Sequence, residues 1–398
     1  MTSPLVDQVS AGDPQQISDA LVARFRDLHG RDPVGCFVAP GRVNLVGEHV
    51  DYNGGRCLPM ALPHATYAVA APRADDVVTV TSLQQEEPWR GRLSALGPGQ
   101  VDGWAAYVAG VAWALQQRGV DLPGMDVVVD SRVPVGAGLS SSAALECSVA
   151  LALCELAGRE VDDRVRRDLV DDCMRAETEV AGAPTGGMDQ TVSLLGRAGH
   201  ALLIDCLDWT TRQVPWDPAA HGLALLVVDT RASHALVDGG YQSRREDCER
   251  AARELDVPTL RHVADPAAAL DRLTDQRVRR RVRHVLTEMA RVDRAVEQLE
   301  AGDYTGLGET FTASHASMRD DFEISCPELD TAVEVALAHG AVGARMTGGG
   351  FGGSAIALVP VDRVGEVEQE AAAAFAAEGW EAPGFLLGTP SDGAHRLA

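Results

Sequence analysis

The stretch PVGAGLSSSAALE, Pro134–Glu146, has two glycines, three consecutive serines and then the start of an apolar run that predicts a helix. Gly136 and Gly138 permit positive φ and let a ligand approach the backbone closely. The first N–H groups of a helix have no partner within it, so the stretch predicts an anion site, with a serine available to Mg²⁺. A tight turn with a serine that caps the helix is the alternative, and these residues alone leave both open.

The absence of lysine limits which kind of phosphate site this stretch could form. All 35 basic side chains among the 398 residues are arginines, whereas Asp and Glu number 58, which gives a net charge of −23. A GxxxxGK[ST] loop is therefore impossible. Such an acidic chain should repel nucleic acid and anionic membranes. A phosphate site would need local compensation from Mg²⁺, an arginine or a helix N-terminus.

Cysteine usage and the N-terminal sequence predict a cytoplasmic protein. The eight cysteines form no CxxC pair, which favours reduced thiols over disulfides or zinc. No basic residue precedes Arg24, which argues against a signal peptide. No apolar segment approaches the roughly 20 residues that a membrane span needs.

Apolar patterning predicts strands and helices along the whole chain. Strands are expected at CFVAP, RVNLVG, TYAVAAP, VVTVTSL, MDVVVDS, HALLIDCLD, LALLVVDT, VGARMT and SAIALVP. Helices are expected within residues 1–30, at 104–118, 143–156, 162–180 and 241–255, and repeatedly between 265 and 339. A strand-rich half gives way to a helix-richer half near residue 195, which predicts two domains, 1–195 and 196–398.

A second glycine cluster, Gly348–Gly353, matches GxGxxG but lies between the strand-like runs VGARMT and SAIALVP. A dinucleotide fingerprint must open a helix early in a βαβ unit, so an oxidoreductase is only a weak alternative. The cluster is either a glycine-rich connection between strands or a backbone wall that lies close against another loop or a ligand.

A third dense stretch, APGRVNLVGEHVDYNGG, spans Ala39–Gly55. Glu48, His49 and Asp51 cluster within four residues and follow Arg42. They could form a polar turn or bind a metal, although there is no HExxH pattern. The hydroxyls of a sugar suit them better, because charge-assisted hydrogen bonds to carboxylates are strong.

Taken together, these three stretches resemble the motifs of the GHMP small-molecule kinases, in the same order and at similar spacing. Within that family, GRVNLVGEHVDYNGG is similar to the galactokinase signature, PVGAGLSSSAALE to the ATP loop and MTGGGFGGSAIAL to the third motif. RAETEVAGAPTGGMDQ and SHASMRDDFEISCPELD point the same way. The resemblance runs from about residue 20 to the tail. It implies an α+β fold of two mixed lobes, with the active site in the cleft between them.

The resemblance also implies an activity: transfer of the γ-phosphoryl group of ATP to the 1-hydroxyl of α-D-galactose, with Mg²⁺, by a monomer. It implies that Asp189 is the catalytic base and that Arg42 stabilises developing charge beside it. The implied sugar-binding residues are Glu48, His49, Val50, Asp51, Gly186 and Tyr241. The implied ATP-binding residues are Ser82, Gly136, Ala137, Gly138, Leu139, Ser140, Ser141 and Ser142, with Trp104 beside Ser82. Ser142 and Glu177 are the implied Mg²⁺ ligands.

Each of these residues also has an ordinary structural interpretation. Asp189 could cap a helix, Glu177 could lie on a solvated face and Tyr241 could simply pack. His315 and Arg319 are expected to be structural.

Two positions depart from the family pattern near the expected sugar pocket. Pro184–Gly187 reads PTGG, where galactokinases more often have a cysteine and a single glycine, and Val50 replaces a usual threonine. The sugar spectrum therefore stays open, with a kinase for N-acetylgalactosamine or a non-sugar alcohol, or a non-catalytic galactose sensor, as alternatives.

Overall fold

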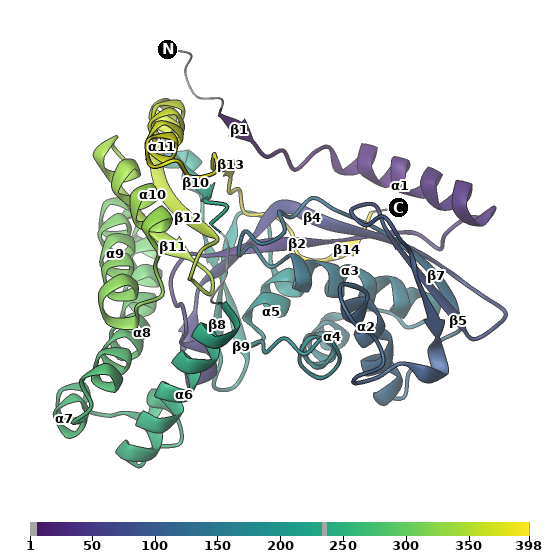
Figure 1. Cartoon of the computed structure of the whole chain (residues 1–398), viewed down its shortest axis with the longest axis horizontal. Coiled ribbons are helices and arrows are strands. Elements are labelled where there is room, and N and C mark those ends of the chain that lie inside the picture. Colours follow the sequence, from purple (N-terminus) through teal and green to yellow (C-terminus); the bar gives the residue numbers. More distant parts are fainter. Residues whose placement is uncertain (1–5, 233–236, 398) are drawn as a thin grey trace.

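The computed structural model describes residues 6–232 and 237–397, and this part of the chain forms two lobes that each combine a mixed sheet with helices (Figure 1). The predicted fold class, α+β with two mixed lobes, is therefore confirmed. In the same part of the chain, no helix is both long enough and apolar enough to cross a membrane.

The N-terminal lobe is built on a six-stranded sheet in the order β14-β2-β4-β7-β5-β6. Its strands are β2 (Cys36–Asn44), β4 (Pro59–Pro72), β5 (Val77–Ser82), β6 (Trp89–Arg92), β7 (Met125–Ser131) and β14 (His395–Arg396). β5 and β7 pair in parallel, and the other neighbouring strands of this sheet are antiparallel.

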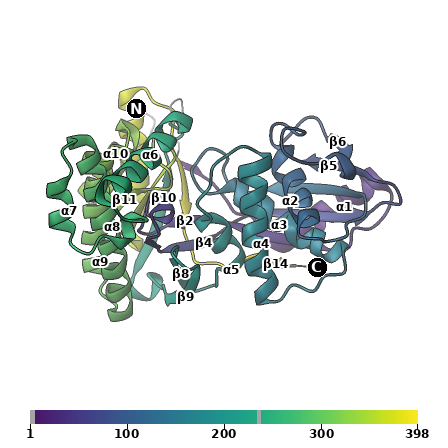
Figure 2. The same ribbon diagram turned by 90° about the horizontal axis from the view of Figure 1, so that it is seen from below.

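Helices cover both faces of this sheet (Figures 1 and 2). α1 (Pro14–His29) packs on one face, and on the other lie α2 (Ala105–Gln117), α3 (Ser141–Leu156), α4 (Asp163–Arg175) and α5 (Met188–Leu195). The period of two in β7 explains the two layers. Val127 and Val129 join the core shared with α3, whereas Val128 joins the core under α1.

The C-terminal lobe has a five-stranded sheet in the order β1-β13-β10-β12-β11. Its strands are β1 (Asp7–Gln8), β10 (Leu223–Asp229), β11 (Gly343–Thr347), β12 (Ser354–Pro360) and β13 (Gly384–Leu387). Its helices are α6 (Val237–Leu255), α7 (Pro266–Arg272), α8 (Gln276–Ala301), α9 (Tyr304–Ser317), α10 (Pro327–Ala338) and α11 (Val364–Glu378).

Alternate residues of β10 connect the two lobes. Leu225 and Val227 join a core that also contains Val43 of β2 and Met60 of β4. Leu226 and Val228 face the opposite side, in the core that α10 and α11 cover. The junction between the lobes is therefore a packed hydrophobic core, which fixes the walls of any site formed between them.

The chain passes between the lobes at several points. A small third sheet pairs β3 (Arg56–Cys57), which follows β2, with β8 (His200–Asp205) and β9 (Thr210–Pro215), which follow α5. The end of α5 at Leu195 coincides with the predicted domain boundary, yet β1 pairs with β13 and β14 pairs with β2 across it. Each terminus thus contributes a strand to the other lobe, and the division at residue 195 stays a prediction.

Two elements differ in detail from the predictions. CFVAP and RVNLVG, expected as two strands, are largely one strand, β2, whose register with β4 shifts between Pro40 and Arg42. A Cβ on the intervening Gly41 would lie 2.6 Å from the Leu139 carbonyl oxygen, so the strand passes very close to the glycine-rich loop. The helix expected at 162–180 is α4 followed by a π-helical turn, Ala176–Val180, a feature often found at functional sites.

Candidate active site

The loop between β7 and α3 has the backbone conformation that its glycines predicted. Gly136 has φ 81° and Gly138 φ 69°, and Ser140 also adopts positive φ, at 61°. Ser140 stands at the N-cap position, but its side chain does not cap α3; its hydroxyl donates a hydrogen bond to Asp189 Oδ2 instead. The alternative of a serine cap is therefore not what this loop forms.

The loop borders a cavity of about 520 Å³, which we call the glycine-rich cavity. Its lining from the loop consists of Gly136, Gly138, Leu139, Ser140, Ser141 and Ser142. The N-terminus of α3 opens here, which suits an anion. Ala137, predicted as an ATP contact, has its side chain in the core, and its carbonyl accepts a hydrogen bond from the Ser354 hydroxyl at 2.7 Å.

The second glycine cluster forms the opposite wall of this cavity. It connects β11 to β12 and begins no helix, so the dinucleotide interpretation is wrong. A Cβ on Gly348 would lie 3.0 Å from the Gly138 carbonyl oxygen, and one on Gly353 would lie 3.2 Å from that of Ala137. The interpretation as a backbone wall against another loop therefore fits the structure.

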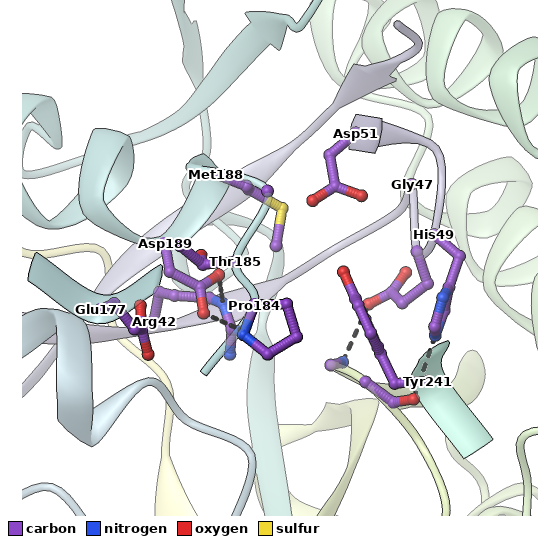
Figure 3. Close-up of a pocket in the computed structure, with 14 residues that line it drawn as sticks. Arg42, Gly47, His49, Asp51, Glu177, Pro184, Thr185, Met188, Asp189 and Tyr241 are labelled. Carbon is purple, nitrogen blue, oxygen red and sulfur yellow. Dashed lines mark hydrogen bonds and ion pairs between the residues drawn. The ribbon is translucent and has the colours of Figure 1, made fainter. Parts of the chain in front are cut away.

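Arg42 and Asp189 form an ion pair at the edge of the glycine-rich cavity (Figure 3). Arg42 Nε and Nη2 donate to the two carboxylate oxygens of Asp189, each at 2.7 Å, and Nη1 donates to the Gly138 carbonyl at 2.5 Å. The N-cap of α5 is Gly187, so Asp189 does not cap that helix. β2, the loop and α5 thus converge on one carboxylate.

On its other side, Asp189 faces a smaller hollow of about 160 Å³, which we call the acidic pocket. Glu48, His49, Asp51, Gly186 and Tyr241 line it, together with Gly47, Arg42, Glu177, Pro184, Thr185, Met188, Gly348 and Gly349. Figure 3 shows Arg42 and Asp189 at one end and His49 and Tyr241 at the other. Residues predicted from three separate motifs therefore meet in one pocket.

His49 is held in place by its two ring nitrogens and by an uncommon backbone conformation. Its φ is 60°, a value that clusters at functional sites in non-glycine residues. Nδ1 lies 2.8 Å from the Tyr52 hydroxyl, and Nε2 lies 3.0 Å from the Gly349 carbonyl oxygen. Burial lowers the pKa of His49 to about 3, so the imidazole is neutral near pH 7.

Asp51 reaches into the acidic pocket against the backbone of Gly186. A Cβ at position 186 would lie 1.7 Å from Asp51 Oδ2, so only glycine leaves room for this carboxylate. Burial raises the pKa of Asp51 to about 6, with a smaller contribution from the charge of Asp189. A carboxylate that lines a pocket and whose pKa is raised in this way favours a ligand that donates hydrogen bonds.

Glu48 belongs to a buried charge cluster that joins the acidic pocket to the C-terminal lobe. Its Oε2 pairs with Arg345, a fully buried arginine, and its Oε1 accepts from the Gly348 amide at 3.1 Å. Arg345 also lies 3.6 Å from Glu288, which the Ser314 hydroxyl and Gly47 amide contact. Sequence reasoning missed Arg345 and Glu288; the position of Arg345, three residues before the first glycine of ARMTGGG, was the available signal.

Glu177 is buried in the π-helical turn rather than solvated on a helix face. The Ser142 hydroxyl hydrogen-bonds to it, and Gln190 Nε2 donates to its Oε2 at 2.5 Å. Burial raises the pKa of Glu177 to about 7. The two predicted metal ligands are thus adjacent, although the described residues contain no group of three or more His, Cys, Asp and Glu side chains suited to a metal.

A third, more apolar hollow of about 220 Å³ adjoins the glycine-rich cavity at Ser141 and Ser142. Ser82 and Trp104, whose role at the nucleotide stays a prediction, line it together with Gln84, Tyr107, Val129, Val135 and Leu145. Its composition suits a flat, largely apolar ring next to the anion site.

The departure at Pro184–Gly187 has a physical reason. Gly187 has φ 89°, and a Cβ there would lie 2.5 Å from Met174 Sδ and 2.8 Å from the Trp209 ring. The second glycine therefore lets Met174 and Trp209 pack against the loop. Val50, the other departure, has its side chain in the hydrophobic core and outside the pocket lining, so its proposed sugar contact stays a prediction.

His315 and Arg319 have structural surroundings, as expected. His315 is buried, its Nδ1 accepts a hydrogen bond from the Met346 amide at 3.3 Å, and its Nε2 lies 3.2 Å from Asp330. Arg319 pairs with the neighbouring Asp320. Neither lines the acidic pocket or the glycine-rich cavity.

Comparison with known proteins identifies the class that this fold and site define. Three family models match successive segments: "GalKase_gal_bdg, galactokinase galactose-binding signature" at 23–72, "GHMP kinases N terminal domain" at 106–197 and "GHMP kinases C terminal" at 295–384. A crystal structure of mevalonate kinase, 16% identical with a TM-score of 0.65 over 91% of this chain and 98% of that one, shares the fold. The architecture is that of a GHMP kinase.

Relatives with higher identity narrow the class. The galactokinase of Streptomyces coelicolor is 49% identical over 96% of this chain and 99% of its own length, and that of Canis lupus familiaris is 41% identical over 94% and 95%. The structure of Lactococcus lactis galactokinase complexed with galactose is 31% identical, with a TM-score of 0.90 over 96% of this chain and 100% of that one. The chain belongs to the galactokinase family.

Proposed function

We propose that this protein transfers the γ-phosphoryl group of ATP to the 1-hydroxyl of α-D-galactose, giving galactose 1-phosphate and ADP. One observation carries the proposal. The Asp189 carboxylate lines both the acidic pocket and the glycine-rich cavity. A hydroxyl bound in the first would face a phosphate bound in the second, with the carboxylate between them. Phosphoryl transfer depends mainly on such positioning.

In this proposal, the sugar occupies the acidic pocket. The Asp51 and Glu48 carboxylates accept hydrogen bonds from its hydroxyls. His49, whose two ring nitrogens already contact Tyr52 and Gly349, contributes its neutral ring to the wall of the pocket. Gly186 leaves room for Asp51, and the Tyr241 ring, 5.1 Å from that of His49, forms an aromatic wall. An epimer would leave a buried carboxylate without its partner, which is the physical basis of selectivity.

Asp189 would take the proton of the reacting hydroxyl. Its contacts with Arg42 and Ser140 hold the carboxylate in one position between the two sites. The proton is taken late, as the hydroxyl becomes more acidic while the phosphoryl group is transferred. Arg42 would stabilise the negative charge that spreads over the transferring group.

On the nucleotide side, the adenine would occupy the apolar pocket beside Ser82 and Trp104, and the phosphates would lie along residues 136–142. Ser142 and Glu177 would hold Mg²⁺, for which a hydroxyl and a carboxylate are suitable hard ligands. The fit is supported by the raised pKa of Glu177, since a buried carboxylate without a cation is unfavourable. When bound, the ion would neutralise phosphate charge.

A substrate panel tests this function. ADP release would be measured with galactose, glucose, galactosamine, N-acetylgalactosamine and mevalonate, and with no acceptor, for the wild type and for Asp189→Asn. Galactose should be among the best substrates, and Asp189→Asn should remove its effect. Better turnover of another alcohol would assign a different GHMP kinase activity. Equal ADP release with and without galactose would indicate a sensor.

We also propose that the protein is a cytoplasmic monomer. All eight cysteines are free thiols in the structure, as expected in a reducing compartment. Size-exclusion chromatography with light scattering would test the oligomeric state, and a mass near twice the 42.1 kDa of the chain would contradict it.

A further inference from the structure

Gln190, the residue after Asp189 in α5, is fully buried and uses every hydrogen-bonding group of its amide. Its Nε2 donates to Glu177 Oε2 at 2.5 Å and to Glu146 Oε2 at 3.1 Å. Its Oε1 accepts from the Thr185 hydroxyl at 3.3 Å. A glutamine amide offers two N–H groups and one carbonyl. Two carboxylates on one side and a hydroxyl on the other fix its orientation.

This amide connects three segments whose relative positions matter for the proposed reaction. Glu177 lies in the π-helical turn, Glu146 on α3 and Thr185 in the loop that lines the acidic pocket. Glu146 follows Ser142 by four residues, so both lie on the same face of α3. The Gln190 side chain therefore ties Glu177 to the helix that carries Ser142.

Glu146 gives a second reason why the amide matters. It is fully buried, and its Oε1 has no hydrogen-bond partner in the described structure. Two buried carboxyl groups placed side by side repel when ionised. The Gln190 N–H groups lie between Glu146 and Glu177 and bind both, which keeps Glu177 in one position beside Ser142.

We propose that Gln190 is a positioning residue for the metal-bound nucleotide, because it holds the Glu177 carboxylate beside Ser142. The proposal rests on the assignment of Ser142 and Glu177 to Mg²⁺ in the proposed function. Groups that hydrogen-bond to metal ligands orient them, and their removal typically lowers metal affinity by about 10- to 100-fold. Although Gln190 neighbours Asp189 in sequence, its effect is expected on the nucleotide side and not on the sugar side.

The test compares binding rather than turnover. The affinity of a non-hydrolysable ATP analogue would be measured by calorimetry with and without Mg²⁺, for the wild type, Gln190→Met and Gln213→Met. Met keeps the length of glutamine and removes its amide. Gln213 is a matched control on β9: its Nε2 donates to the Leu195 carbonyl at 2.8 Å, and it lines neither the acidic pocket nor the glycine-rich cavity. Gln190→Met should lose most of the Mg²⁺-dependent gain, by about tenfold or more, and Gln213→Met should keep it.

Galactose affinity without nucleotide is the second readout. It should stay within about twofold of wild type in Gln190→Met, because the amide contacts Thr185, Glu146 and Glu177 and none of the predicted sugar ligands. If Gln190→Met does not fold, Gln190→Asn serves, since it retains an amide that is one methylene too short to bridge both carboxylates.

Three outcomes would overturn the proposal, and they can be distinguished. A Mg²⁺-dependent gain in Gln190→Met equal to that of the wild type would exclude a role for Gln190 and leave the proposed function intact. No Mg²⁺-dependent gain in the wild type would overturn the assignment of Ser142 and Glu177 as well. An equal loss of galactose and nucleotide affinity would show general structural damage and contradict a positioning role.

Discussion

The glycine-rich cavity and the acidic pocket share Asp189, yet different kinds of groups line them. Glycines from two loops line the cavity: Gly136 and Gly138 adopt positive φ, and the cluster at 348–353 packs closely against Gly138 and Ala137. The pocket is lined by charged and aromatic side chains that other buried side chains hold in place. A backbone site suits the phosphates that every kinase of this class binds, whereas a site of interlocked side chains can distinguish one alcohol from another.

The largest expected effect concerns the carboxylate that the two regions share. Asp189→Asn keeps the shape of the side chain but cannot accept a proton as a carboxylate does. Loss of a general base should lower kcat on the order of 10²–10⁴-fold. The KM for galactose should change much less, because the sugar is bound by other groups. Steady-state kinetics with both substrates measures this split.

The binding of galactose and of nucleotide by Asp189→Asn is the control for folding, since Arg42 loses part of its ion pair. A kcat within about tenfold of wild type would mean that the proton leaves by another route. Asp189 would then lie between the two regions without acting as the base.

The second largest effect concerns the buried charge cluster that supports the acidic pocket. Arg345→Met removes the buried cation that pairs with Glu48 and lies 3.6 Å from Glu288. Removing one partner of a buried ion pair typically costs about 3–5 kcal/mol of unfolding free energy. Urea denaturation would measure the loss, and galactose affinity should fall with it because Glu48 loses its anchor.

Arg363→Met is the matched control for that experiment. Arg363 is half exposed and pairs with Glu366 on the surface, so its loss should cost less than about 1 kcal/mol. If the two variants were equally stable, the buried cluster would contribute nothing to the rigidity of the pocket.

The difference between the regions also explains what could be predicted from the sequence. The glycine-rich loops depend on local backbone conformation, so GAGLSSS and GGGFGG can each be recognised from a few consecutive residues. Arg42, Asp51 and Asp189 belong to short motifs that the family resemblance could place. The fold class and the meeting of these motifs in one site were predicted from that resemblance.

The supporting side chains could not be predicted in this way. Arg345 contacts Glu48 across almost 300 residues of sequence, and Gln190 bonds to Glu146 and Glu177 from a different helix. A buried arginine or glutamine in an apolar environment carries no sequence pattern of its own, because its partners come together only in the folded chain. The π-helical turn at Glu177 could not be predicted either, because its apolar periodicity resembles that of the preceding helix.

A smaller effect tests whether the acidic pocket needs glycine at position 186. Gly186→Ala would bring a Cβ to 1.7 Å from Asp51 Oδ2, so the carboxylate must move away from its position in the pocket. Misplacing a charged acceptor should cost about 1.5–3 kcal/mol, roughly ten- to a hundredfold in galactose affinity. Nucleotide affinity should be unchanged, because the phosphate loop is not touched.

Gly365→Ala is the matched control, since nothing lies within 4 Å of a Cβ at that position in α11. It should leave both affinities unchanged and slightly stabilise the helix. Equal galactose affinity in Gly186→Ala and Gly365→Ala would show that Asp51 does not need its present position.

The smallest effect concerns pH and depends on the electrostatics of the acidic pocket alone. Burial raises the pKa of Asp51 to about 6, and the sugar hydroxyls need its ionised form as an acceptor. Galactose affinity should therefore be constant above pH 6 and fall by about tenfold for each pH unit below it, as the carboxyl is protonated. His49 does not contribute, because its pKa is lowered to about 3 and the ring stays neutral in this range.

Galactose binding should be measured by calorimetry between about pH 5 and 8, without nucleotide, because Glu177, with a pKa raised to about 7, would otherwise add a second transition from the phosphate side. Asp51→Asn should bind more weakly at pH 7 and lose the pH dependence. A pH dependence that persists in Asp51→Asn would assign the titration to another group. In that case the acidic pocket would distinguish its sugar by shape and neutral hydrogen bonds, and the contrast with the backbone-lined cavity would be smaller than the charges of the two regions suggest.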